Sequence, residues 1–122
     1  MTTLVLLRLD WPSPKLNPNN SKGRSHWYNQ KERKAAKQKA WGEALNRGVK
    51  NLSGDKFTLK ATAYPPTRHK RDDDNFLSSL KWHRDGIAAA MGVDDSAFTW
   101  EPVEFVYGAE AAGVLIEVRG QE

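Results

Sequence analysis

The stretch KFTLKATAY (56–64) alternates strictly between apolar and polar side chains, and DNFLSSLKWHRDGIAAAMG (74–92) follows it after a proline-containing turn. Alternation with a period of two predicts a half-buried strand. Apolar residues lie at helical spacing in the second segment, and Gly86 in its middle is expected to weaken or split that helix. The sequence therefore predicts a strand that leads into a helix at the centre of the fold.

The N-terminal half adds another strand and another helix. TTLVLLR (2–8) is largely apolar and predicts a buried strand, and QKERKAAKQKAWGEALNRG (30–48) is rich in good helix formers and ends in glycine. Between them, residues 10–29 carry three prolines and four asparagines, which predicts a long loop.

The C-terminal third predicts two more strands. Residues 93–98 have the composition of a turn, and PVEFVYG (102–108) and GVLIEVR (113–119) both alternate. The short connection between these two strands favours a hairpin. Together the elements predict one small α/β domain over residues 1–122, with a mixed β-sheet and two main helices.

Composition excludes several classes of protein. The 122 residues contain no cysteine, which excludes disulfides, cysteine-ligated zinc and a cysteine nucleophile. No apolar run approaches the length of about 18 residues that a membrane-spanning helix needs, and the N-terminus lacks the features of a signal peptide. We expect a cytoplasmic protein without membrane association.

The positive charge is unevenly distributed along the chain. Residues 1–50 hold eleven Lys/Arg and three Asp/Glu, a net charge of +8, whereas residues 51–122 hold eight Lys/Arg and twelve Asp/Glu, a net charge of −4. Cations gathered in one part of a chain favour a polyanionic partner such as nucleic acid. A solvated basic surface without a partner is the alternative interpretation.

Three consecutive aspartates follow a basic run in RHKRDDDN (68–75). If the chain is extended there, Asp72 and Asp74 point to the same side, and their carboxylates repel each other unless a cation binds between them. Mg²⁺ suits such a place, because it takes one or two carboxylates together with water and substrate phosphates. Asp94 and Asp95, in the turn after the second helix, are placed to return to the same neighbourhood.

The same residues also fit a purely structural interpretation. Aspartate is a favoured N-cap and suits the first turn of a helix, so one of Asp72, Asp73 and Asp74 is expected to be a cap in either case. Asp94 and Asp95 are also ordinary turn residues.

Cations surround the acidic stretch. Arg68, Lys70 and Arg71 would either neutralise the aspartates or bind DNA phosphates beside a metal that activates water. Lys81 shares a helix face with Asp74 and leans back toward the carboxylates. There it would contact the scissile phosphate, or it would simply remain solvated.

The combination of RHKRDDDN, a helix and GVDDSAF (92–98) resembles the RusA family of Holliday-junction resolvases, small endonucleases carried by phages and prophages. The N-terminal part agrees with this resemblance. Its first strand runs into WPSP, and an Asn-rich loop leads through KGRSHWYN into a basic helix. The resemblance covers most of the chain, in the right order.

The resemblance implies a RusA-like mixed α/β fold, a homodimer, Mg²⁺ dependence with Mn²⁺ as an alternative, and paired nicking of four-way DNA junctions in recombination and repair. By position it implies Asp72, Asp74 and Asp95 as catalytic metal ligands. Many members place an essential lysine four residues after the second aspartate, where this chain has Ser78. Either Lys81 substitutes for that lysine, or this branch of the family handles charge differently.

The Asn-rich loop mixes cations with aromatic side chains, as contacts to distorted or unpaired DNA would. Lys22 and Arg24 are expected DNA contacts in this loop, together with His26, Trp27 and Tyr28. The alternative is that Trp11 and Trp27 pin the loop to the core.

Two other functions stay open at this point. A non-catalytic DNA-binding or architectural phage protein would use the aspartates as caps and as salt-bridge partners of Arg68, Lys70 and Arg71. A nuclease acting on flaps or replication forks would carry the same motif, because branch geometry is read by the dimer.

Overall fold

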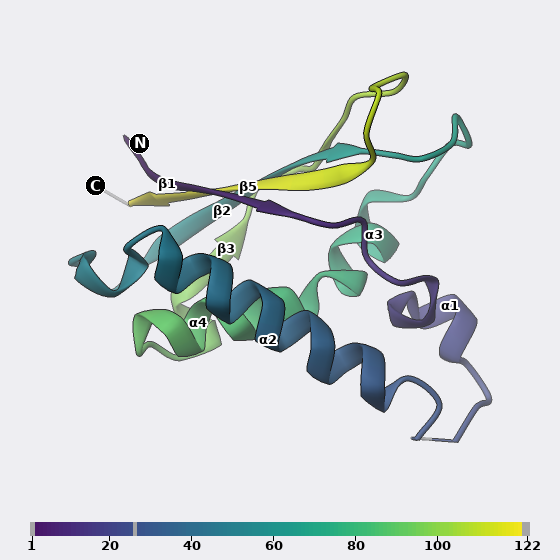
Figure 1. Ribbon diagram of the computed structural model, residues 1–122, viewed down its shortest axis with the longest axis horizontal. Helices are drawn as coiled ribbons and strands as arrows, with labels where there is room; N and C mark the ends of the chain where they lie inside the picture. Colours follow the sequence, from purple (N-terminus) through teal and green to yellow (C-terminus); the bar gives the residue numbers. More distant parts are fainter. Residues whose placement is uncertain (1, 26, 121–122) are drawn as a thin grey trace.

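The computed structural model describes residues 2–25 and 27–120, which form a single α/β domain around a five-stranded mixed sheet (Figure 1). The strands are β1 (Thr2–Leu9), β2 (Phe57–Tyr64), β3 (Phe98–Trp100), β4 (Glu104–Phe105) and β5 (Gly113–Gly120). Their order is β1-β5-β2-β3, and β4 also pairs with β2. β5 runs antiparallel to β1 and β2, whereas β3 and β4 run parallel to β2.

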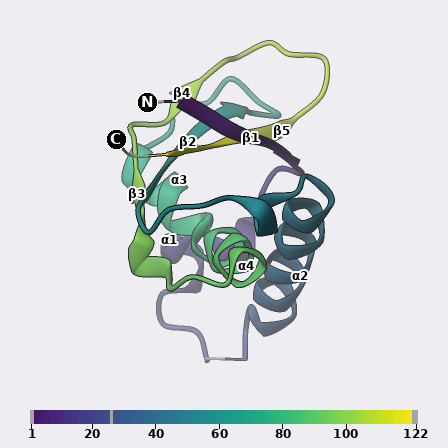
Figure 2. The same cartoon turned by 90° about the vertical axis from the view of Figure 1, so that its left-hand side faces the viewer.

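The helices lie on one side of the sheet, and α2 and α4 cover most of its buried face (Figures 1 and 2). They are α1 (Pro18–Ser21), α2 (Gln30–Asn46), α3 (Asp73–Ser79) and α4 (Lys81–Met91), with 3-10 turns η1 (Pro14–Leu16), η2 (Val49–Asn51) and η3 (Asp95–Ala97). None of the helices in the described residues has both the length and the apolar run that crossing a membrane requires.

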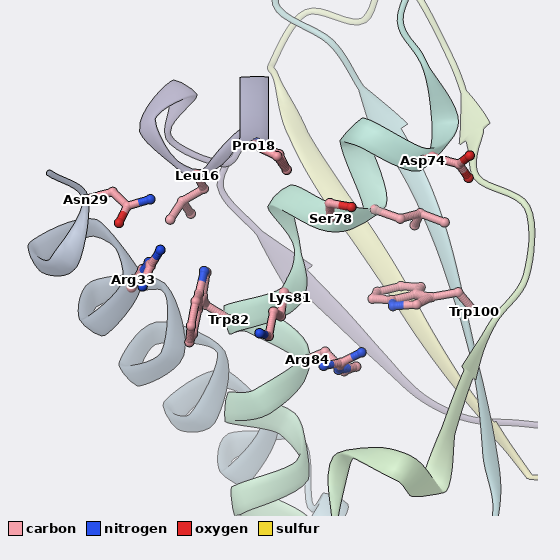
Figure 3. A pocket seen from close by; sticks show the side chains of 11 residues that line it. Leu16, Pro18, Asn29, Arg33, Asp74, Ser78, Lys81, Trp82, Arg84 and Trp100 are labelled. Carbon is pink, nitrogen blue, oxygen red and sulfur yellow. The ribbon is translucent and has the colours of Figure 1, made fainter. Parts of the chain in front are cut away.

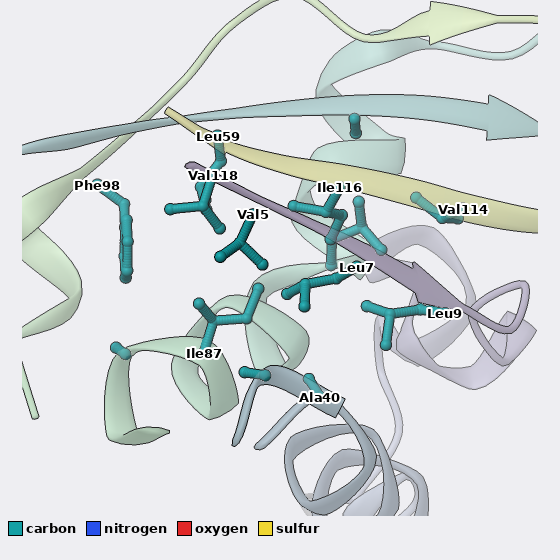
Figure 4. Packing of buried hydrophobic residues seen from close by; sticks show 14 of the residues in the cluster. Val5, Leu7, Leu9, Ala40, Leu59, Ile87, Phe98, Val114, Ile116 and Val118 are labelled. Atoms are coloured by element: carbon teal, nitrogen blue, oxygen red, sulfur yellow. The ribbon is translucent and has the colours of Figure 1, made fainter. Parts of the chain in front are cut away.

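Alternating apolar residues of the strands build the core (Figure 4). The inward side chains of β2 and β5 are fully buried, among them Leu59 and Ile116, and β1 contributes Leu7. Ala40 and Ile87 bring the facing surfaces of α2 and α4 against them. The strands predicted at 56–64 and 113–119 are therefore confirmed, because their alternation matches one buried face of a sheet. The strand predicted at 2–8 is also present, but it lies at the end of the strand order and is only half buried, since Leu4 and Leu6 are exposed.

Gly86 is where α4 approaches α2 most closely. A Cβ atom at this position would collide with the backbone carbonyl oxygen of Lys37 and would lie 3.0 Å from the backbone nitrogen of Trp41 and 3.1 Å from Cβ of Ala40. Only glycine permits this separation, since every larger residue begins with a Cβ. The glycine that seemed to weaken the helix in fact lets it dock.

The predicted helix 74–92 does break, but at Leu80 rather than at Gly86. Leu80 ends α3 and precedes α4 with a ψ of 4°, outside regular helix geometry. Beside it, the hydroxyl of Ser79 donates a 2.6 Å hydrogen bond to the carbonyl of Phe76. Such bonds from serine to the preceding turn bend helices, which accounts for the break.

The expected hairpin between 102–108 and 113–119 is wrong. Only Glu104–Phe105 of the first segment is a strand, and it pairs in parallel with β2, where the backbone N–H of Val106 donates to the carbonyl of Ala63 at 2.8 Å. β5 instead pairs along its whole length with β1 and β2. Alternation identified the strands but carried no information about their partners.

The predicted loop 10–29 contains η1 and α1, so that expectation holds only in part. Pro14 and Pro18 occupy the first turn of these short helices, a position that proline favours. Trp11 anchors the segment by packing on Phe76, with ring centroids 5.0 Å apart.

Candidate functional site

A hollow of about 570 Å³ opens among α2, α3, α4 and β3 (Figure 3). It is lined by Leu16, Pro18, Asn29, Arg33, Asp74, Leu77, Ser78, Lys81, Trp82, Arg84 and Trp100. The lining combines one carboxylate with three cationic side chains and two indole rings. Such a combination suits an anionic ligand that also carries an aromatic base.

Asp74, Ser78 and Lys81 reach this hollow together, although the helix breaks between the second and the third. Asp74 lies in the first turn of α3 and is exposed. Its carboxylate forms no hydrogen bond or ion pair with any other described residue. Asp74 is therefore an unneutralised negative group in a largely cationic setting.

Asp72 has a different environment. It is the N-cap of α3, and its Oδ1 accepts a 3.2 Å hydrogen bond from the backbone N–H of Asn75. It lines another hollow, of about 410 Å³, together with Lys70 and Arg71. The expectation that an extended chain turns Asp72 and Asp74 to one side is wrong, because the helix begins at Asp73. The expected capping role is confirmed.

Asp94 and Asp95 also have different environments. Asp94 caps η3, where its Oδ2 accepts a 3.0 Å hydrogen bond from the backbone N–H of Ser96, and the Ser96 hydrogen bonds lower the pKa of the Asp94 carboxyl. Asp95 accepts a 3.0 Å hydrogen bond from Nη2 of Arg84, which also reaches Asp85 at 3.3 Å. Arg84 lines the 570 Å³ hollow, whereas Asp95 is connected to that hollow only through this contact with Arg84.

The described residues contain no group of three or more acidic or imidazole side chains that could together hold a metal ion. The set Asp72, Asp74 and Asp95 is thus not assembled as three ligands in this structure. Of the three, only Asp74 lines the larger hollow; Asp72 lines the 410 Å³ hollow, and Asp95 contacts Arg84, a lining residue of the larger one.

The basic run before α3 is not paired with the aspartates. Arg71 donates to the carbonyls of Thr67 and His69 at 3.0 and 2.7 Å, and its guanidinium stacks over Trp11 at 5.2 Å. The guanidinium of Arg68 lies against Gly108. Within residues 2–25 and 27–120, none of the ion pairs joins Arg68, Lys70 or Arg71 to an aspartate.

Two cations flank Trp82 at the larger hollow. Figure 3 shows its indole ring between Arg33 and Lys81, and their charged groups lie 4.7 and 4.8 Å from the indole centroid. Cation–π attraction favours these positions of both cations, weakly for the exposed Lys81. The basic character of α2 was evident from the sequence, but its connection to Trp82 depends on helix packing.

The Asn-rich loop presents cations and aromatic rings to solvent. Lys22 and Arg24 are exposed, and the Arg24 guanidinium lies 4.8 Å from the centre of the Tyr28 ring. Trp27 is 69% exposed. His26 lies outside the described residues.

Sequence reasoning missed four residues of the larger hollow: Arg33, Trp82, Arg84 and Trp100. It also missed His83, which is buried beside Ala36 of α2 and whose pKa burial lowers to about 4. Adjacent aromatic and basic residues at 81–84 were the available signal.

Comparison with known proteins gives one informative match. No protein-family model matches the chain. A protein of Xylella fastidiosa that carries only the name "Uncharacterized protein" is 39% identical over 120 residues, which span 93% of this chain and 75% of that protein. Identity at this level over nearly the whole chain shows common descent. The chain belongs to the same family as this Xylella fastidiosa protein.

Proposed function

We propose that the protein is a divalent-metal-dependent endodeoxyribonuclease that acts on branched DNA, in the manner of the RusA family that its sequence resembles. The observation that carries this proposal is the unneutralised carboxylate of Asp74 in the same hollow as Arg33, Lys81 and Arg84. Cations bind the phosphodiester there, while the carboxylate is available for a metal ion.

The donor set suits Mg²⁺ or Mn²⁺ with two protein carboxylates rather than three. Asp74 and Asp95 are the candidate ligands, and Mg²⁺ commonly takes only one or two carboxylates, with water and substrate phosphates completing its shell. Arg84 lines the hollow and donates to Oδ2 of Asp95, so a second carboxylate is bonded to one of the lining residues. A bound ion would supply charge neutralisation at the phosphate and would lower the pKa of water.

The remaining steps belong to the protein side chains. Lys81 and Arg33 carry charges toward the hollow from both sides of Trp82, where they would bind phosphate oxygens and stabilise charge that develops during cleavage. Ser78 occupies the position at which many RusA members have lysine, so Lys81 is the cation that would act in its place. A homodimer would present two such sites to opposed strands of a junction.

Cleavage of a synthetic four-way junction with Mg²⁺ tests this proposal. Wild-type protein is expected to nick the junction in preference to linear duplex and flap substrates at equal salt. The Asp74→Asn variant should bind the junction with unchanged affinity and cut it at least about a hundredfold more slowly. Equal cutting by wild type and Asp74→Asn would remove the proposed centre.

Asp73→Asn is the matched control, because it makes the same charge change in the same helical turn at a residue outside the hollow. Asp72→Asn separates two roles, since asparagine caps a helix as well as aspartate does. Retained cutting by Asp72→Asn would restrict this residue to capping. A loss equal to that of Asp74→Asn would make it a third ligand, as the resemblance implies.

The second candidate is a non-catalytic DNA-binding protein. The capping role of Asp72 and the ion pair of Asp95 favour this non-catalytic function. It also requires ion pairs of Arg68, Lys70 and Arg71 with aspartates, and the described residues contain no such pair. Thermal melting with and without Mg²⁺ or Mn²⁺ distinguishes the two functions. A metal site raises the melting temperature when the ion is added, and a set of caps does not.

A further inference from the structure

A further hollow, of about 480 Å³ and distinct from the 410 Å³ hollow beside Asp72, lies on α2 next to the candidate site. It is lined by Gln30, Arg33, Lys34, Lys37 and Trp82. Arg33 and Trp82 also line the 570 Å³ hollow, so these two residues form the boundary between it and the 480 Å³ hollow. We call both hollows together the α2–α4 groove. It extends from Asp74 of α3, past Arg33 and Trp82, to Lys37 of α2.

The far half of the groove is purely basic as far as the described residues show. Its lining includes no carboxylate, and Lys34 and Lys37 are exposed with no ion pair to any residue in 2–25 or 27–120. Two other lysines nearby do form ion pairs: Lys39 pairs with Asp10 at 2.9 Å, and Lys15 lies 3.5 Å from Glu32. Two unpaired lysines one helical turn apart favour an anionic ligand that runs along α2.

The ring at the boundary favours a ligand with flat aromatic groups. Lys81 covers one face of Trp82, but it is exposed and flexible. An exposed cation–π contact changes an equilibrium by only about two- to fivefold, whereas stacking of a nucleobase on an aromatic ring contributes about 5- to 150-fold. A base can therefore displace Lys81 from the indole, and the released ammonium group remains close enough to bind a phosphate.

We propose that the α2–α4 groove binds an unpaired DNA strand, with phosphates on Arg33, Lys34 and Lys37 and one base stacked on Trp82. This inference rests on the proposed function in taking DNA as the ligand, and it names the part of a branched substrate that the protein holds beside the cleavage site. Duplex DNA fits less well, because its bases are stacked on each other and do not reach the indole.

Binding of fluorescein-labelled oligothymidylate, about 20 nucleotides long, tests the proposal with EDTA present so that no cleavage occurs. Anisotropy is measured between about 50 and 200 mM NaCl for wild type and for Lys34→Gln/Lys37→Gln. Loss of two phosphate contacts should lower the slope of log K against log salt by about 1.4, since a single strand releases about 0.7 counterion per contact. Both lysines are exposed, so the fold should be unaffected, which circular dichroism checks.

The matched control is Lys50→Gln/Lys56→Gln, which makes the same charge change at exposed residues beyond the far end of α2. This variant should keep the wild-type slope. An equal fall in slope for both double variants, or an equal loss of affinity for a duplex of the same length, would overturn the assignment to an unpaired strand.

Tryptophan fluorescence tests the stacking contact separately. Oligothymidylate should quench the emission of the wild-type protein, and Trp82→Phe should lose part of that quenching. Quenching that is the same for both proteins would overturn the role of Trp82. Because EDTA prevents cutting, these outcomes are independent of the Asp74→Asn result, so failure of the groove and failure of the nuclease proposal are distinguishable.

Discussion

The two faces of α4 differ sharply, although they are built from neighbouring residues. The face toward α2 is buried, with Gly86 in close approach to the α2 backbone and His83 buried on the same side. The face toward the hollow is charged and open, with Lys81 exposed and Arg84 bonded to Asp95. Two consecutive polar residues of α4 therefore have opposite environments: His83 is buried, whereas Arg84 lines the hollow.

This difference shows what fixes the geometry of the candidate site. Contacts on the packed face set the distance and rotation of α4 relative to α2. They therefore also determine where the side chains of the open face lie. Changes on the packed face should alter the free energy of unfolding, whereas changes on the open face should alter ligand handling with little effect on stability. The following predictions test this division, from the largest expected effect on stability to the smallest.

Gly86→Ala should reduce the free energy of unfolding by about 3 kcal/mol, because the new Cβ collides with the backbone of α2, which cannot move aside locally. Urea denaturation measures the effect. Gly42→Ala is the control within α2: a Cβ there meets no atom within 4 Å, so the change should stabilise by about 1 kcal/mol through helix propensity. Similar effects of both substitutions would contradict the close approach.

His83 should make stability pH-dependent. Burial lowers its pKa from 6.5 to about 4 in the folded state, so the unfolded chain binds a proton that the folded protein does not over this range. The stabilisation is complete above about pH 6.5 and is lost as the pH falls toward 4, by about 3 kcal/mol in total.

Urea unfolding between about pH 7 and pH 4 measures this loss. His83→Leu should flatten the curve in this window, while His69→Leu, at an exposed histidine, should follow the wild-type curve. If His83→Leu keeps the wild-type pH dependence, the imidazole is not buried as described.

Arg84→Gln lies at the boundary of the two faces and should cost about 1 kcal/mol, because its contacts with Asp95 and Asp85 are only partly screened. Arg47→Gln, which removes an exposed pair with Glu43 within α2, should cost about 0.4 kcal/mol. Thermal melting at low and high salt compares them. If Arg84→Gln is as stable as Arg47→Gln, the contact of Arg84 with Asp95 contributes no more to stability than an exposed ion pair does.

Lys81→Gln should change stability by less than about 0.5 kcal/mol, because the side chain is exposed. Under the nuclease proposal it should nonetheless slow junction cutting by about tenfold or more, since it removes a cation from the phosphate position. Unchanged cutting would make Lys81 a solvated surface residue and would leave Arg33 as the cation at Trp82.

Local pattern predicted much of the fold. The alternation of 56–64 and 113–119 identified β2 and β5, and the composition of 30–48 identified α2, because one buried face leaves a period in the sequence. The pairing of β4 with β2 and the existence of β3 were missed. Both are short strands whose backbone bonds go to a distant segment, and no period marks such a choice.

For the candidate site too, the sequence predicted some features, whereas others depend on tertiary packing. Asp74, Ser78 and Lys81 line one hollow as the sequence predicted, although α3 ends before Lys81. The ion pair of Asp95 with Arg84 and the placement of Trp82 between two cations depend on how α4 packs against its neighbours. The extended-chain argument for Asp72 and Asp74 failed because capping started a helix one residue earlier than expected.

The sequence by itself determined which segments are strands and helices, where charge accumulates, and that aspartates and cations stand together, since these depend on neighbours along the chain. Only the tertiary structure decided that Gly86 is a docking position, that β5 lies between β1 and β2, and that Asp74 and Asp72 line different hollows. The reason is physical: side-chain periodicity fixes which face of an element is buried, whereas the partner that buries it is selected by packing among residues far apart in the chain.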